Sequence, residues 1–257
     1  MKIYHGRKRG LIIMDHWLSL IYIIGFIIVH FGSKYVKLSV ASPRSFWFSL
    51  FGGATIAYMF LFLLPELNQY FETVKSNVGD SWPSILDNYT YLLALIGLII
   101  YFGMDLYARS RKDVDEEDPD STSEPVLLVH MSTFVFYNVT IGYLLIRGEF
   151  ISGMDLTVYF IALSAHFIVT DFTLKELHSG VHDKYGRWIL SAAVLIGWLI
   201  GALYELPTWI VSIAISLLAG GITFNVFKEE LKESTFKNYF AFVGGAFVIA
   251  ALVMVFT

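Results

Sequence analysis

The chain has 257 residues, of which 56% are hydrophobic, 17% aromatic and 16% charged, and its formal net charge is −4. A soluble domain carries about 25% charged residues, so this composition argues against a water-soluble enzyme, a nucleic-acid-binding protein and a disordered chain. The sequence contains no cysteine, which excludes disulfides, iron–sulfur clusters and thiolate zinc sites.

Long apolar blocks follow one another along the chain and predict an all-α integral membrane protein. Each block is close to the roughly 20 residues that a helix needs to cross about 30 Å of hydrocarbon, and only a helix satisfies its own backbone groups there. We expect a bundle of about eight transmembrane helices in one polytopic domain, 1–257, with a tight turn at 204–207. The blocks are 11–31, 46–66, 89–108, 126–146, 154–174, 188–204, 207–227 and 238–256.

The Lys and Arg residues between blocks predict the orientation, because such residues gather on the cytoplasmic side. They favour the loops after the first, third, fifth and seventh blocks: Lys34, Lys37, Arg44, Arg109, Arg111, Lys112, Lys175, Lys184, Arg187, Lys228, Lys232 and Lys237. These loops are therefore expected in the cytoplasm, with both termini outside and a flexible acidic loop at 109–125. The basic N-terminus opposes this orientation, and seven spans with the first block lying in the membrane interface is the alternative.

Polar side chains inside the fourth and fifth blocks are the candidate functional residues, because ionisable groups in a span are costly. If consecutive spans run in opposite directions, Asn138 and His166 each lie about 3 Å from the bilayer centre, while His130 and Asp171 share a layer about 9–10 Å toward the cytoplasm. Imidazole, carboxylate and amide groups suit zinc, iron or manganese. We therefore predict a metal site formed by His166, Asp171, Asn138 and His130.

Three more polar residues of these blocks, Tyr137, Thr133 and Thr170, are expected to line the pathway to that site. The same groups also suit a proton relay, or hydrogen bonds that only hold helices together. His30 lies near the end of the first block and is expected at the membrane interface, and Asp105 also lies near a block end.

Several cofactors and reactions have no counterpart in the sequence. No lysine lies within a block interior, so retinal bound as a Schiff base is excluded. No phosphate-binding loop, dinucleotide fingerprint or Ser-His-Asp set is visible, so we expect no nucleotide cofactor and no enzyme activity.

The residues of the fourth and fifth blocks resemble the ZIP family of divalent-metal transporters, helical bundles with eight spans and both termini outside. The family carries His-Asn-x-x-Asp/Glu-Gly in span four, and residues 137–142 read YNVTIG, with matching Asn and Gly. It carries His-Glu-x-Pro-His-Glu or a variant in span five, and residues 166–171 read HFIVTD, with matching first His and last acid. Residues 63–66 (LLPE) and 219–221 (AGG) also look like elements of spans two and seven.

The resemblance implies a secondary transporter of divalent metal cations, with zinc, iron or manganese as the bound substrate between spans four and five. It adds Glu66 of the second block to the pathway. Ile141, Phe167 and Thr170 stand where the family has metal ligands, which favours the first alternative, a ZIP-like membrane protein without transport that acts as a sensor or assembly partner. A second alternative is an intramembrane metal hydrolase using His130, His166 and Asp171 with an activated water.

The expected surroundings follow from the same reading. The partners are the lipid bilayer and a divalent cation, a homo-oligomer is compatible with the sequence, and no nucleic acid is expected. The lack of cysteine and of organelle signals favours a prokaryotic plasma membrane.

Overall fold

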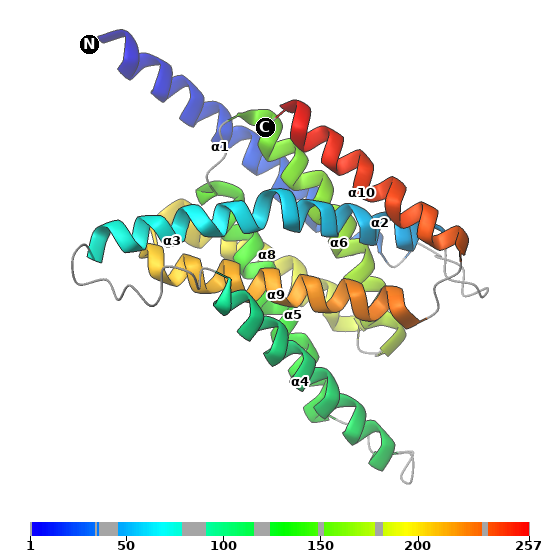
Figure 1. The fold of residues 1–257 in the computed structure, drawn as a ribbon. Helices are drawn as coiled ribbons and strands as arrows, with labels where there is room; N and C mark the ends of the chain where they lie inside the picture. Colours follow the sequence, from blue (N-terminus) through cyan, green and yellow to red (C-terminus); the bar gives the residue numbers. More distant parts are fainter. Residues whose placement is uncertain are drawn as a thin grey trace.

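Every element of regular structure in the described part of the chain is a helix (Figure 1). The computed structural model describes residues 2–33, 35, 46–78, 91–115, 124–148, 152–177, 182–232 and 236–256, and at several helix ends it describes the backbone alone. The elements are α1 (Lys2–Gly32), α2 (Phe46–Tyr58), the π-helical turn η1 (Met59–Leu63), α3 (Leu64–Val78), α4 (Leu92–Asp115), α5 (Glu124–Arg147), α6 (Gly153–Leu177), the π-helical turn η4 (His182–Gly186), α8 (Arg187–Leu203), α9 (Thr208–Lys232) and α10 (Phe236–Phe256).

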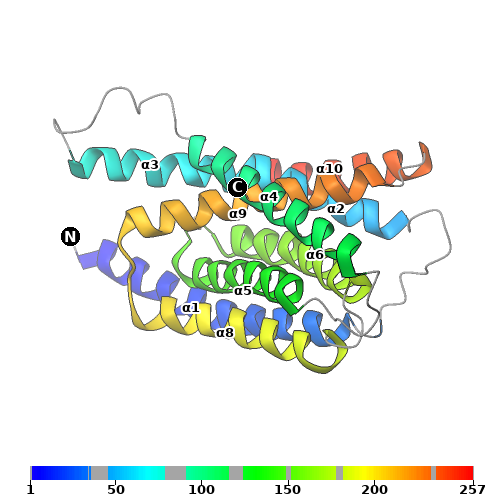
Figure 2. The ribbon, with the colours of Figure 1, turned by 90° about the horizontal axis from the view of Figure 1, so that it is seen from below.

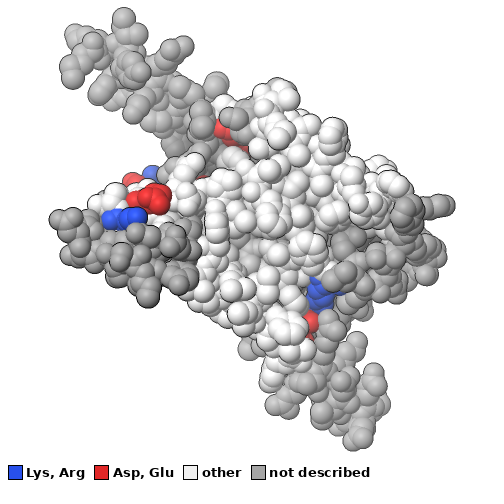
Figure 3. All heavy atoms as spheres, in the orientation of Figure 1, with Lys and Arg blue, Asp and Glu red and all other residues white. Residues whose placement is uncertain are grey.

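Several of these helices are long and apolar enough to cross a membrane, so the chain is an all-α multi-pass membrane protein. Among the described residues five stretches reach this length: Phe46–Ser76, Gly153–Lys175, Lys184–Leu203, Thr208–Lys228 and Asn238–Val255. The parts of α1 and α4 whose side chains are described, Trp17–Gly32 and Leu92–Tyr107, are also apolar. Figure 3 shows that the described surface of one face carries few charged side chains, and these lie toward its edges. Each predicted block overlaps a helix, but the number of about eight spans stays a prediction.

The helices pack as two groups that meet along one boundary (Figure 2). One group contains α1, α5, α6 and α8, and the other contains α2, α3, α4, α9 and α10 (Figure 2). Helix α6 lies at the boundary and packs against both α1 of its own group and α2 of the other. Across the boundary, α2 and α10 contact α6, while α4 and α9 contact α5. The fourth and fifth predicted blocks, which carry most of the candidate residues, therefore lie in one group and face the other.

Glycines allow the closest helix pairs to approach. A Cβ on Gly197 of α8 would lie 2.0 Å from the carbonyl oxygen of Val139 in α5, and one on Gly142 would lie 2.0 Å from that of Val194. The pairs α2–α10 and α4–α9 meet in the same way, through Gly53, Gly245 and Gly220. Between helices in lipid, attraction comes from close van der Waals packing more than from the hydrophobic effect, so these glycines determine which helices pair.

A π-helical turn joins α2 to α3 directly in front of Pro65. Proline has no N–H to donate, and its ring clashes with the carbonyl group four residues earlier. The backbone N–H of Leu64 donates to the carbonyl oxygen of Met59, five residues earlier, so this turn is wider than an α-helical one. Glu66 then lies in the first turn of α3 and is buried.

The predicted tight turn at 204–207 is confirmed and joins α8 to α9. Arg147, at the end of α5, donates from Nε to the carbonyl oxygen of Gly201 at 2.6 Å. The backbone N–H of Leu206 donates to the hydroxyl oxygen of Tyr143 at 3.0 Å. The end of α5 therefore holds the turn in place.

Two predicted loops are partly helical. Helix α4 continues to Asp115, into the predicted acidic loop 109–125, of which residues 116–123 lie outside the described residues. Lys228 and Lys232, expected in the loop after the seventh block, belong to α9 instead. In both places a helix extends past its apolar stretch, because helical hydrogen bonding continues where the chain leaves the hydrocarbon.

Substitution of Gly197 tests the contact between α5 and α8. We expect Gly197→Ala to destabilise the protein by about 1–3 kcal/mol, the usual cost of overpacking, because the new methyl group meets backbone rather than a side chain that can move. Thermal unfolding in detergent measures the change.

The matched control is Gly103→Ala in α4, where nothing lies within 4 Å of the added Cβ. This substitution should be neutral or stabilising by up to about 1 kcal/mol. Equal effects of the two substitutions would contradict the glycine contact.

Candidate functional site

A buried histidine at the end of α1 joins the two predicted functional helices. His30 and Asp171 have side chains that are each 1% exposed, and Nδ1 of His30 lies 2.9 Å and 3.1 Å from the two carboxyl oxygens of Asp171 in α6. On the other side of the ring, Nε2 lies 2.7 Å from Oδ1 of Asn138 in α5. Three helices therefore meet at one imidazole ring.

The orientation of Asn138 decides which atoms carry protons. Its Nδ2 donates to the carbonyl oxygen of Phe134 at 2.8 Å, and a carbonyl can only accept. Oδ1 of Asn138 therefore faces His30 as an acceptor, and Nε2 of His30 donates to it. Between Nδ1 and Asp171 there is one further proton, on either the imidazole or the carboxyl group, so the pair has no net charge in both cases. This neutrality lowers the cost of burying the pair in an apolar bundle.

Aromatic rings enclose this cluster. The ring of Phe167 packs against that of His30, with centroids 4.5 Å apart, and the ring of Phe26 packs edge-on against Phe167 at 4.9 Å. Because these rings exclude water, the bond between His30 and Asp171 lies in a low-dielectric environment, where each polar contact is strengthened.

His166 lies next to this cluster, on the side that faces the other group of helices. Its side chain is 2% exposed, and its Nδ1 has no hydrogen-bond partner among the described residues. The ring of Tyr137 lies edge-on to the His166 ring, with centroids 6.2 Å apart. The backbone carbonyl of His166 accepts a hydrogen bond from the hydroxyl group of Thr170. A buried nitrogen without a partner costs stability, and it remains available to bind a ligand.

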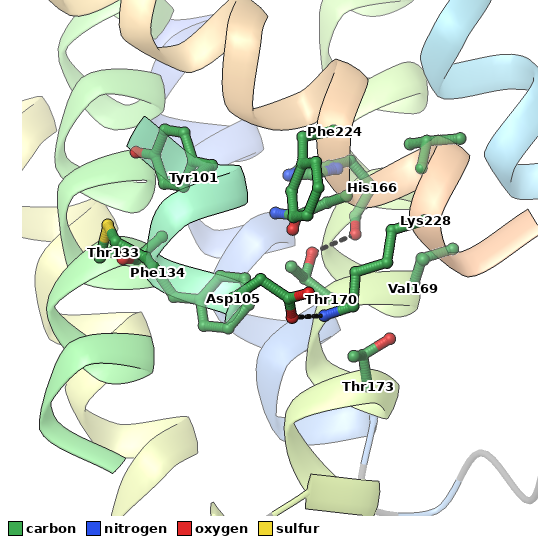
Figure 4. Close-up of a pocket in the computed structure, with 13 residues that line it drawn as sticks. Tyr101, Asp105, Thr133, Phe134, His166, Val169, Thr170, Thr173, Phe224 and Lys228 are labelled. Carbon is green, nitrogen blue, oxygen red and sulfur yellow. Dashed lines mark hydrogen bonds and ion pairs between the residues drawn. The ribbon is translucent and has the colours of Figure 1, made fainter. Parts of the chain in front are cut away.

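A cavity of about 40 Å³ lies beside His166, between α4, α5, α6 and α9 (Figure 4). Thr133 and Thr170, two of the residues that the sequence analysis named for a pathway, line this cavity. An ion pair between Asp105 of α4 and Lys228 of α9, 2.5 Å apart, also borders the cavity. The sequence analysis had assigned neither member of this pair to the site.

The structure brings together most of the predicted site residues. Some of them are linked by hydrogen bonds, and others are only neighbours. Asn138 and Asp171 are linked through His30, and His166 lies beside them. His130 lies in α5, and at this position the structure describes the backbone alone. Tyr137 is buried beside His166, while Glu66 is buried in α3 and is not among the residues that line the cavity.

The expectation for His30 is wrong. We expected an interfacial side chain, and the structure places it in the buried core of the site. A signal was present in the sequence. If the first span runs inward, His30 lies near its cytoplasmic end, in the same layer as Asp171. Matching depth between nonconsecutive spans made the two residues one possible pair, but depth alone does not show which helices are neighbours.

The arrangement of these groups is not that of a preformed metal site. Among the described side chains no group of three or more His, Asp or Glu residues converges as metal ligands. Both nitrogens of His30 are already bonded, so His30 itself could bind a cation only after one of these bonds is broken.

The sequence matches no protein-family model, and a search of curated proteins finds no match to it. The assignment of function therefore depends on the site itself.

A double-mutant cycle tests the bond between His30 and Asp171. Either His30→Ala or Asp171→Ala should lower the free energy of unfolding by about 1–3 kcal/mol, because each leaves a buried polar partner unsatisfied. The double variant should lose less than the sum of the two, with a coupling energy of about 0.5–3 kcal/mol. Denaturation of the purified protein measures all three.

The control is Thr140→Val in α5, which removes a buried hydroxyl group bonded only to the carbonyl of Phe136 in its own helix. It should change stability little and show no coupling with Asp171→Ala. Strictly additive effects of His30→Ala and Asp171→Ala would contradict the pairing.

Proposed function

We propose that the protein is a divergent ZIP-like secondary transporter of divalent metal cations of the zinc, iron or manganese class. The observation that carries the proposal is the buried set of Asp171, Asn138, His30 and His166, contributed by α1, α5 and α6 beside a cavity. Carboxylate, amide and imidazole groups are costly in an apolar bundle, and together they form a ligand set for these cations.

Binding would proceed by exchange at the carboxylate of Asp171. His30 leaves this carboxylate, and the cation takes its place, with Asn138 Oδ1 and the unpartnered Nδ1 of His166 as further ligands. Loss of the bond to His30 costs part of the binding energy, so affinity is moderate. Moderate affinity suits a transporter, because a substrate that binds too tightly is not released.

A second candidate is a ZIP-like membrane protein without transport activity. It is favoured by the mutual saturation of His30, Asn138 and Asp171, each of which has a hydrogen-bond partner in this cluster. In that case the cluster serves to hold α1 against α5 and α6, and His166 is a neighbouring core residue.

The orientation and location are part of the same proposal. We place both termini outside and the basic segments after the odd-numbered spans in the cytoplasm, by the distribution of Lys and Arg. Protease protection of an N-terminal tag in sealed vesicles tests this arrangement.

Flux measurements separate the two candidates. The purified protein is reconstituted in liposomes that contain an indicator dye for zinc or manganese, and cation entry is followed with time. If the proposal holds, Asp171→Asn and His166→Ala should each lower the rate by at least about tenfold, the effect of losing a ligand worth 1.4 kcal/mol. Zinc or manganese should also raise the melting temperature of the unsubstituted protein, and not that of Asp171→Asn.

The matched control is Asp155→Asn in the first turn of the same helix. Asp155 is also buried, but its carboxylate accepts hydrogen bonds from the backbone N–H and the hydroxyl group of Ser152, as in a helix cap. It should leave flux nearly unchanged. Absence of flux and of a metal-dependent thermal shift in the unsubstituted protein would support the candidate without transport.

A further inference from the structure

The cavity extends from His166 along successive turns of α6. His166, Thr170 and Thr173 all line it, and seven residues of helix correspond to about 10 Å. Its opposite wall comes from α4 and α9, through Tyr101, Met104 and Phe224. The cavity therefore lies on the boundary between the two groups of helices and leads from His166 toward the C-terminal end of α6.

Three of the residues that line this space carry a buried polar atom with no hydrogen bond to the described part of the chain. They are His166 with Nδ1, Thr173 with Oγ1 and Asn225 with Nδ2. Buried polar atoms of this kind are normally satisfied by water. The volume of about 40 Å³ exceeds the roughly 10–15 Å³ that one water needs, so the cavity can be hydrated along its length.

The Asp105–Lys228 ion pair lies where this hydrated space reaches the end of the apolar stretches. In the sequence of α9 the charged residues Glu229 and Glu230 follow Lys228, and in that of α4 Arg109 and Arg111 follow Asp105. The side chains of Lys228 and Asp105 are 13% and 8% exposed. The ammonium group of Lys228 also lies 5.9 Å from the centre of the Phe224 ring, a favourable distance for a cation–π contact. Figure 4 shows the pair lying across the space that His166 and Thr173 border.

We propose that this cavity is an access route between His166 and one membrane surface, and that the Lys228–Asp105 ion pair closes it. Lys228 closes the route sterically and also by charge, because its ammonium group repels an incoming cation. A lysine side chain is long and flexible, and it can extend into the membrane interface. When it does so, it removes the repulsion and leaves the carboxylate of Asp105 facing the cavity.

The role of this route in cation passage rests on the proposed transport function. The opening of the cavity is independent of that function, because it can be measured without a substrate. The chain contains no cysteine, so a single introduced cysteine reports the accessibility of one position.

The test introduces Thr173→Cys and measures its reaction with a membrane-impermeant thiol reagent in vesicles of either orientation. With Lys228 present, labelling should be slow. Adding Lys228→Gln should accelerate labelling about tenfold or more, from one side of the membrane only, because labelling follows the population of the open state. Adding Lys228→Arg instead, which keeps the charge and the pairing, should leave labelling slow.

Two further cysteines serve as controls. Phe247→Cys lies on the exposed face of α10, where Phe247 is 73% exposed, and Thr140→Cys is buried away from the cavity. Lys228→Gln should not change the labelling rate of either control cysteine. Labelling of Thr173→Cys that stays within about twofold when Lys228→Gln is added would overturn the proposal, as would equal acceleration at Thr140→Cys, which indicates general loosening.

A flux assay on the same variants separates the two proposals. Faster labelling in Lys228→Gln with no cation flux in any variant supports the closure by Lys228 and counts against transport. Cation flux in the unsubstituted protein, with labelling and flux both unchanged by Lys228→Gln, supports transport and overturns the closure.

Discussion

A strongly polar group inside a lipid-embedded bundle needs partners on neighbouring helices, and His30 provides them for two helices at once. Its ring connects Asn138 of α5 with Asp171 of α6, so the last turn of α1 is held in the interior. Earlier turns of α1 contribute similar contacts, through the hydroxyl groups of Tyr22 and Ser19. The position of α1 is therefore determined by hydrogen bonds, whereas apolar packing alone would allow it to rotate or slide.

The two groups of helices differ in how they neutralise charge. In the group of α1, α5, α6 and α8, the carboxylate of Asp171 is neutralised by His30. In the other group, the carboxylate of Asp105 is neutralised by Lys228. Neither pair crosses the boundary between the groups, where the cavity lies and where buried polar atoms lack partners among the described residues. The boundary is therefore held together mainly by apolar and aromatic contacts, and it is the region where a ligand can enter at least cost.

Most of the fold was predictable, because long apolar blocks indicate helices directly. Within the site, Asn138, His166 and Asp171 were predictable because such residues are rare in spans. His30 was not, since position along a helix gives depth but not which neighbour the helix meets. The same limit applies to Asp105 and Lys228, which are separated by 123 residues in the sequence. Their helices are not consecutive, and only the three-dimensional packing brings them together.

The π-helical turn before Pro65 has a consequence for the register of the second long helix. Each residue of an α-helix turns the chain by about 100°, and a π turn accommodates one residue more than an α turn in the same length. The π turn therefore absorbs one extra residue between Tyr58 and Leu64 without changing which face of α3 points inward. Removal of one residue there would restore regular α geometry and leave Glu66 and Leu67 in their buried positions. The same deletion inside α3, where no π turn can absorb it, would rotate every later residue by about 100°, so this short segment is the place in the helix where a change of length is least disruptive.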